Sequence, residues 1–288
     1  MRPRCRRCLS TDSADIIHEN KPVPRDRLWY VPVNLCAILK QKFFIVEKSM
    51  DILYIVIPAY NESETIESVI NDWYPVVEKH NGGGQSRLVI IDDGSKDNTY
   101  AIMQEYAKDR PLFEPVTKPN GGHGATVLFG YNYALERGAD YIFQTDSDGQ
   151  TLPSEFEPFW DERENWDMVI GWRNNRQDGS SRVFVTRTLK AVIRLKFGVT
   201  VTDANTPYRL MKAETLRKYI NLVPENFNLS NVVITVILTK KHCKVKYIPI
   251  TFRPRQGGVN SINLKKIFKI GQKALSDFAE INKIIDKA

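Results

Sequence analysis

Two carboxylates, Asp146 and Asp148, are separated by one residue in the polar run 144–150, which directly follows the apolar residues 141–143. Carboxylate oxygens suit Mg²⁺ and Mn²⁺, and two of them on one loop bind the ion without surrounding it. The open coordination positions then accept phosphate oxygens of a substrate. The alternative is a solvated Asp-rich turn, since so short a pattern is common in loops.

Two earlier segments favour the metal interpretation, because each is an apolar stretch that ends in polar residues. Residues 55–59 lead into the loop 60–65, and residues 88–91 lead into the loop 92–95. Both stretches have the composition of buried strands. In an open parallel α/β sheet, ligands bind beyond the carboxyl ends of the strands. We therefore expect these two loops to converge with the loop that carries Asp146.

The residues after the first loop have the spacing of an amphipathic helix. Asn61 and Glu64 are three residues apart, as in a capping box, so we expect Asn61 to cap this helix. The capping role is the structural alternative to a ligand contact for Asn61. The expected buried face consists of Ile66, Val69, Ile70, Trp73 and Val77.

Together these motifs resemble the family 2 glycosyltransferases with the GT-A fold, most closely the dolichol-phosphate mannosyltransferase-like branch. The resemblance extends over residues 51–263. It implies an α/β, Rossmann-like domain with a mostly parallel sheet flanked by helices. It also implies an inverting, metal-dependent glycosyltransferase that uses Mg²⁺ or Mn²⁺ and a UDP- or GDP-linked nucleotide-diphospho-sugar.

The resemblance assigns roles to residues in the three loops. Asp148 is the expected catalytic carboxylate on the metal ion, Asp146 lies near both ion and ribose, and Gln150 completes the metal ligands. The nucleotide-sugar-binding residues implied in these loops are Pro58, Tyr60, Glu62, Asp92, Asp93 and Asp146.

A glycine-rich segment, residues 118–126, precedes another helical pattern. N–H groups at a helix start attract anions, so Lys118 and Gly122 are expected at the donor phosphates. The alternative is a close backbone approach that only glycine permits. His123 occupies a position where the family has a small basic residue, and we assign it to the lining of the site rather than to catalysis.

Several arginines follow the expected strand 168–173. A guanidinium group can bind phosphate through two parallel hydrogen bonds. By the resemblance, Arg173 and Arg187 lie near an acceptor phosphate and count among the catalytic residues. Arg176 and Arg182 are expected in a solvated loop.

A later motif that begins at Asp203 is similar to the D-x-x-x-G-F-R motif of the branch, with Pro207 in place of the glycine. It implies that Asp203 lines the sugar site as a catalytic residue. Arg209 either braces that site from beneath or forms a structural ion pair. Arg255 corresponds to an arginine that contacts the donor diphosphate, whereas Ser261 stands where the branch has a lysine.

The acceptor follows from a missing general base. Inverting transferases that act on a hydroxyl group need a base, and such family members carry a Glu-Asp pair that residues 225–231 lack. A phosphate acceptor is already anionic and needs mainly positioning. We therefore favour a polyprenyl phosphate, dolichyl or undecaprenyl. The alternative is a glycan hydroxyl in polysaccharide or cell-envelope glycan synthesis, with Asp203 as base.

Two other classes of protein fit the sequence less well. A nucleotidyltransferase carries a glycine-rich basic loop after its first strand, where this chain has residues 58–62. A nonenzymatic nucleotide-sugar binder has no need for the intact Asp146, Asp148 and Gln150.

The net charge of +7 lies mostly in residues 1–50, which hold ten Lys or Arg against five Asp or Glu. The remainder of the chain is nearly neutral, which argues against a nucleic-acid partner. The basic segment is a candidate for peripheral contact with anionic lipid; the alternatives are a solvated arm or packing onto the catalytic domain.

We expect three segments: an N-terminal extension (1–50), a GT-A domain (51–263) and a C-terminal amphipathic helix (264–288). We expect the apolar face of this helix to dock on the core or on a second copy in a homodimer, with contact to a membrane surface as the alternative. The apolar stretch 28–46 is interrupted by polar residues, so we expect neither a signal peptide nor a membrane-spanning helix.

The cysteines bear on the compartment. Cys5 and Cys8 form half of a zinc motif, and no second pair stands at a usable spacing. Four cysteines without a regular framework suit a reducing compartment, so we expect a cytoplasmic protein or one on the cytoplasmic face of a membrane.

Overall fold

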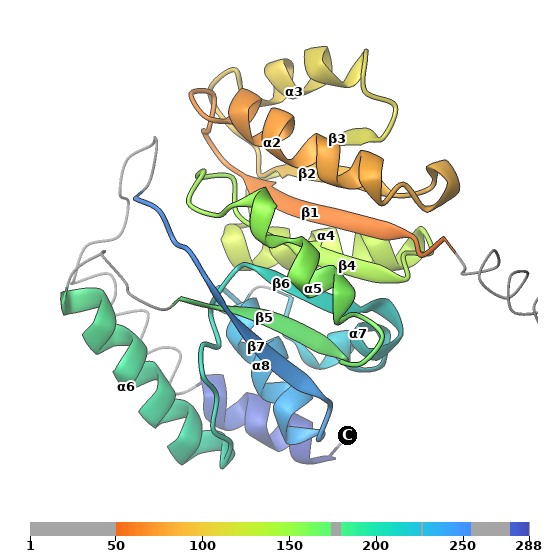
Figure 1. Cartoon of the computed structure of the whole chain (residues 1–288). Helices are drawn as coiled ribbons and strands as arrows, with labels where there is room; N and C mark the ends of the chain where they lie inside the picture. Colours follow the sequence, from red (N-terminus) through yellow and green to blue (C-terminus); the bar gives the residue numbers. More distant parts are fainter. Residues whose placement is uncertain (1–49, 174–179, 226, 255–276, 288) are drawn as a thin grey trace, which may run out of the picture. The chain divides into compact units, whose positions relative to one another are not determined.

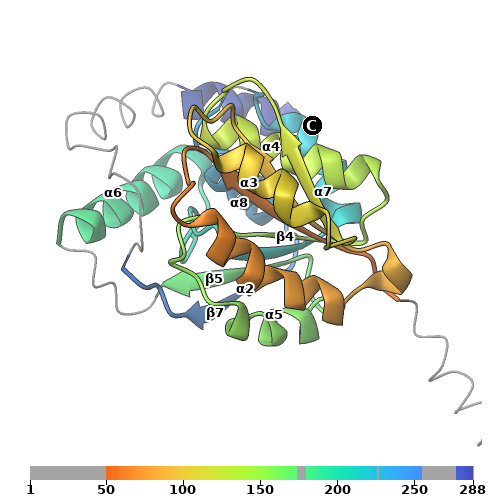
Figure 2. The same cartoon turned by 90° about the horizontal axis from the view of Figure 1, so that it is seen from above.

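The computed structural model describes residues 50–173, 180–225, 227–254 and 277–287. This part of the chain forms a seven-stranded sheet with helices on both faces (Figures 1 and 2). The predicted mostly parallel α/β sheet is thus confirmed. The predictions for Arg255, for Cys5 and Cys8, and for the extension up to residue 49 lie outside the described residues.

The strand order is β3-β2-β1-β4-β6-β5-β7. Only β6 runs antiparallel to its two neighbours, β4 and β5; the other pairs of neighbouring strands are parallel. The strands are β1 (Leu53–Ala59), β2 (Arg87–Asp92), β3 (Phe113–Thr117), β4 (Tyr141–Gln144), β5 (Met168–Arg173), β6 (Arg209–Lys212) and β7 (Val245–Ile250). Strand β1 lies between β2 and β4 and runs parallel to both. The loops after these three strands therefore leave the sheet at the same edge.

Helices cover the two faces of the sheet. In Figure 2, α2 and α5 lie on one side and α4 and α8 on the other. The helices are α2 (Ile66–Lys79), α3 (Thr99–Ala107), α4 (His123–Glu136), α5 (Glu157–Asp161), α6 (Ser180–Phe197), α7 (Ala213–Tyr219) and α8 (Ser230–Lys240). Residues 277–287 form a further helix.

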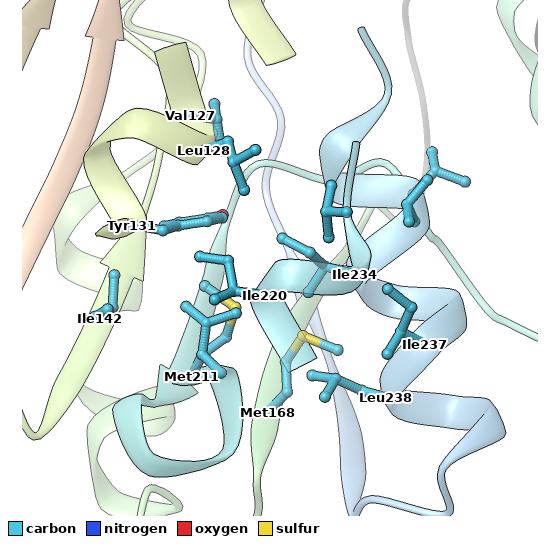
Figure 3. Close-up of a cluster of buried hydrophobic side chains, with 14 of the residues drawn as sticks. Val127, Leu128, Tyr131, Ile142, Met168, Met211, Ile220, Ile234, Ile237 and Leu238 are labelled. Atoms are coloured by element: carbon cyan, nitrogen blue, oxygen red, sulfur yellow. The ribbon is translucent and has the colours of Figure 1, made fainter. Parts of the chain in front are cut away.

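Two hydrophobic clusters result, and β1 contributes to both. Its residues Leu53, Ile55 and Ile57 belong to the cluster under α2, α3 and α5. Its residues Tyr54 and Val56 belong to the cluster under α4, α7 and α8. Alternate side chains of a strand point to opposite faces, so a strand covered on both faces is apolar throughout. Figure 3 shows the second cluster, in which Tyr131 of α4 lies among aliphatic side chains.

The predicted buried face of α2 is confirmed, but the predicted cap is wrong. The helix begins at Ile66, after Thr65, and Asn61 lies outside it with a positive φ of 53°. The Asn61 side chain instead accepts a hydrogen bond from the Lys96 N–H at 2.8 Å. Asparagine tolerates this left-handed conformation, and its short amide bonds to the neighbouring loop.

Helix α8 is enclosed by the rest of the domain. Every residue from Ser230 to Leu238 is buried. Helices α4, α6 and α7 all contact α8. The helix therefore has no solvent face along most of its length, which is typical of a helix that is apolar all round.

The helix of residues 277–287 packs into the same core. Phe278, Ile281 and Ile285 are each 1% exposed, and the Phe278 ring lies 5.2 Å from that of Phe197. The predicted docking on the core is confirmed for this part of the C-terminal segment. Among the described residues, none of the helices has both the length and the apolarity needed to cross a bilayer.

Candidate active site

The loops after β1 and β2 are joined by hydrogen bonds between residues more than thirty positions apart. Three backbone N–H groups of the first loop donate to side chains of the second, and one bond runs the other way. The bonds join Asn61 N to Ser95 Oγ (2.9 Å), Glu62 N to Thr99 Oγ1 (2.9 Å), Ser63 N to Asp97 Oδ2 (3.2 Å) and Lys96 N to Asn61 Oδ1 (2.8 Å). The two loops are therefore held together without a ligand.

Thr65 connects these loops to the one after β4. Its buried hydroxyl lies within hydrogen-bond distance of Glu62 Oε2 (3.0 Å) and of the Ser147 carbonyl oxygen (3.2 Å). Ser147 stands between the two predicted metal-binding aspartates. The expected convergence of the three loops is thus confirmed, and Thr65 is a residue that the sequence analysis missed.

Asp93 is bound by the glycine-rich segment. Its carboxylate accepts hydrogen bonds from the N–H groups of Gly121 and Gly122, both at 2.8 Å, and pairs with the Lys118 ammonium group. Burial opposes ionisation of Asp93, but these contacts outweigh it and hold its pKa below the usual range. In this arrangement Lys118 and Gly122 hold a carboxylate of the same chain, which favours the structural alternative over a contact with donor phosphates.

Asp92 is also engaged in structural contacts. Its Oδ1 accepts from the Ser95 N–H at 3.1 Å, and its Oδ2 accepts from Thr117 Oγ1 at 2.7 Å. The side chain is buried, as is Pro58 within β1. Tyr60, by contrast, is 41% exposed and is the most accessible of the predicted nucleotide-binding residues in this loop.

Asp146, Asp148 and Gln150 offer oxygen ligands of the type that Mg²⁺ and Mn²⁺ prefer. The Asp146 side chain is 28% exposed. Gln150 donates from Nε2 to the Arg253 carbonyl oxygen at 2.8 Å, so its amide oxygen, the possible ligand atom, is on the other side of the group. Within the described ranges, no three His, Cys, Asp or Glu side chains gather as a metal site.

His123 lies beside the aspartates, as expected for a residue that lines the site. Its Nε2 is 3.1 Å from Asp146 Oδ1. Desolvation opposes the charged imidazole, but the carboxylates of Asp146, Asp148 and Asp93 outweigh it and raise the pKa of His123.

Two predicted catalytic residues, Arg173 and Asp203, form a bidentate ion pair. The Arg173 Nε to Asp203 Oδ2 distance is 2.9 Å and the Nη2 to Oδ1 distance is 3.0 Å. Their side chains are only 9% and 5% exposed, and the guanidinium carbon lies 5.2 Å from the centre of the Phe252 ring. Arg187 lies on a different element, exposed on α6.

Arg209 is fully buried and therefore cannot touch a ligand. Its guanidinium group donates to the carbonyl oxygens of residues 204, 206 and 231 and to Thr235 Oγ1. These acceptors are all neutral, which supports the predicted brace beneath the site rather than a structural ion pair. Burial lowers the pKa of Arg209.

A buried polar cluster that the sequence analysis missed adjoins Asp146. It consists of Tyr131, Gln144 and Asn231, which come from α4, β4 and α8. The sequence feature that could have indicated this cluster is a polar residue beside each of two apolar segments: Gln144 follows residues 141–143, and Asn231 precedes residues 232–234.

Comparisons with known proteins show what this chain is similar to. Residues 54–220 match the model of the family described as "Glycosyl transferase family 2". Polyprenol monophosphomannose synthase of Mycolicibacterium smegmatis is 27% identical over 233 residues, which cover 76% of this chain and 85% of that protein. Undecaprenyl-phosphate mannosyltransferase of Micrococcus luteus is 25% identical over 217 residues, which cover 72% of this chain and 86% of that protein.

A solved structure shares the fold at low sequence identity. It is glucosyl-3-phosphoglycerate synthase from Mycobacterium tuberculosis in complex with Mn²⁺ and uridine-diphosphate-glucose. The TM-score is 0.58 and the identity is 18%, with 81% of this chain and 79% of that chain covered.

Proposed function

The chain belongs to glycosyl transferase family 2, and from this premise we propose that it transfers a sugar from a nucleotide-diphospho-sugar to a polyprenyl phosphate, in a reaction that depends on Mg²⁺ or Mn²⁺. The observation that carries the proposal is the convergence of three strand-end loops on Asp146 and Asp148. The printed names of two relatives supply the class of acceptor.

The donor half of the site comprises the loops after β1, β2 and β4. Tyr60 and Glu62 contact the nucleoside, and Asp146, Asp148 and Gln150 hold the cation. When bound, the ion neutralises negative charge on the departing diphosphate. Asp92 and Asp93 act indirectly: their carboxylates bond to the loops that surround the nucleotide and hold those loops in place.

The acceptor half contains Arg173, Asp203 and Arg187. An acceptor phosphate oxygen attacks the anomeric carbon from the side opposite the nucleotide, and the bond to the diphosphate breaks, so the configuration inverts. The phosphate is ionised near neutral pH and gives up no proton to the protein. The bidentate bond from Arg173 to Asp203 suits a carboxylate that positions a phosphate-binding guanidinium group. A lipid acceptor also implies contact with a membrane surface.

The first test concerns Asp148. We expect Asp148→Asn to lower transfer to polyprenyl phosphate by at least about a hundredfold and to remove the Mn²⁺-dependent part of nucleotide binding, because an amide is a poorer ligand for a hard cation. Calorimetry with and without Mn²⁺, together with turnover, gives the answer. Asp161→Asn, at an exposed position of α5, is the matched control. Unchanged activity and metal dependence in Asp148→Asn would contradict the assignment.

The second test separates a phosphate acceptor from a glycan hydroxyl. With a phosphate acceptor, Asp203→Asn keeps measurable turnover, and its defect lies in the positioning of Arg173. With a hydroxyl acceptor, the same change removes a general base and costs about two to four orders of magnitude. Turnover of wild type and variant on both acceptors distinguishes the two. Wild-type activity that is confined to hydroxyl acceptors would reject the proposed acceptor.

A further inference from the structure

Three polar side chains meet inside the second hydrophobic cluster. Tyr131 and Gln144 have no exposed surface, and Asn231 is 5% exposed. Figure 3 shows Tyr131 surrounded by apolar side chains such as Leu128 and Ile142. Burial of a polar group is unfavourable unless it forms hydrogen bonds, so the contacts among these three residues must offset a substantial desolvation cost.

The hydrogen bonds form a chain that ends at Asp146. Tyr131 Oη lies 3.1 Å from Asn231 Oδ1, Asn231 Nδ2 lies 3.0 Å from Gln144 Oε1, and Gln144 Nε2 lies 3.2 Å from Asp146 Oδ1. A carboxylate can only accept, so Gln144 presents its NH₂ group to Asp146 and its oxygen to Asn231. Burial raises the pKa of the Tyr131 hydroxyl, which therefore remains a donor at the inner end.

The chain of hydrogen bonds is anchored at Asn231, one of its inner members. The Asn231 carbonyl oxygen accepts from Arg209 Nη1 at 3.0 Å and from Thr235 Oγ1 at 2.8 Å. Arg209 belongs to β6, which pairs with β4, the strand that ends in Gln144. The first turn of α8 is therefore fixed to the same part of the sheet from which the Asp146 loop departs.

The chain of hydrogen bonds engages one oxygen of Asp146. Oδ1 accepts from Gln144 and lies 3.1 Å from His123 Nε2. Among the described residues, none bonds to Oδ2, and the side chain is 28% exposed. An oriented carboxylate with one oxygen held inside the protein leaves the other for a ligand.

We propose that Tyr131, Asn231 and Gln144 form a buried relay that orients Asp146, and that Gln144 is a positioning residue for metal-dependent binding of the nucleotide-sugar. The inference rests on the proposed function, because it takes Asp146 as a ligand of the cation. Partners behind a metal ligand commonly change metal affinity by about 10- to 100-fold when they are removed.

The test compares Gln144→Met with wild type. We expect the affinity for UDP or GDP in the presence of Mn²⁺ to fall about tenfold, whereas the affinity measured with EDTA stays unchanged. A higher Mn²⁺ concentration restores binding, which a general loss of structure does not permit. The control is Tyr133→Phe. Tyr133 lies on α4, as Tyr131 does, but its hydroxyl bonds to Glu114 and is not part of the relay.

A second variant separates positioning from stability, because Gln144→Met leaves the buried Asn231 Nδ2 group without its acceptor, while Tyr131 still donates to Asn231 Oδ1. In the triple variant Tyr131→Phe, Asn231→Leu, Gln144→Met the whole relay is apolar, and we expect its melting temperature to lie above that of Gln144→Met. Its Mn²⁺-dependent affinity should stay about tenfold below wild type. Recovery of both properties would overturn the relay. A wild type whose nucleotide binding ignores Mn²⁺ would instead overturn the proposed function, and this inference with it.

Discussion

Among single residues, Asp93 differs most from its expected role. The resemblance assigned it to the nucleotide, yet its carboxylate is only 5% exposed and binds Lys118, Gly121 and Gly122. A sequence pattern shows that an acid follows a strand, but not which donors face it, because these donors stand 25 to 29 positions further along the chain. The type and place of this residue were predictable, and its partners were not.

Asp93→Asn should lower the free energy of unfolding by about 3 kcal/mol at neutral pH, because it breaks a buried ion pair and leaves Lys118 without its partner. The native pKa of Asp93 lies below its value in the unfolded chain. Its contribution is therefore complete above the unfolded value of about 3.9 and is lost as the pH falls through the lower native pKa. Urea unfolding over a series of pH values measures this difference.

The control for Asp93 is Asp109→Asn, which changes an exposed carboxylate. It should leave stability unchanged at each pH. A difference between Asp93→Asn and wild type that persists unchanged through the acid range would show that the carboxylate charge does not stabilise this loop.

At the level of elements, the start of α4 depends on a close backbone approach. A Cβ atom on Gly124 would lie 2.2 Å from the carbonyl oxygen of Phe227 and 2.8 Å from the backbone of Asn228. Ser230 Oγ also donates to the Gly124 carbonyl oxygen at 3.0 Å. The glycine is therefore required where α4 meets the segment before α8, which agrees with the structural alternative given for this motif.

Gly124→Ala should destabilise the protein by about 1–3 kcal/mol, because the added methyl group forces two backbone segments apart. Helix propensity alone predicts the opposite sign, since alanine is favoured over glycine by about 1 kcal/mol within a helix. Thermal unfolding therefore distinguishes packing from propensity. Asn132→Ala, at an exposed position of the same helix, should be neutral or slightly stabilising. A stabilised Gly124→Ala would refute the close contact.

Local sequence patterns predicted a helix well where only one of its faces is buried, and a strand well where its residues form a continuous apolar run. The expected strand 168–173 coincides with β5, and the expected face of α2 is buried. The cap at Asn61 was wrong because its amide bonds to Lys96, 35 positions away, instead of to its own helix. Capping rules consider only near neighbours, so they cannot anticipate a competing loop.

For the whole molecule, the order of the motifs predicted the fold and the convergence of three loops. Parallel strands place their carboxyl ends at one edge, and this rule needs no side-chain detail. The relay behind Asp146 was not predictable in the same way. Its members are separated by 13, 87 and 100 positions and meet only after the sheet and both helices have packed.

The antiparallel strand β6 also divides the sheet. Pro58, Asp93 and Asp148 belong to the β3-β2-β1-β4 side, whereas Arg173 lies on the β5-β7 side. With the roles proposed above, the residues that select the donor lie at or beyond the ends of strands on one side of β6, and Arg173, which contacts the acceptor, lies at the end of a strand on the other side. Evolution can then alter the sugar that is transferred, or the lipid that receives it, while the other side of the sheet keeps its architecture.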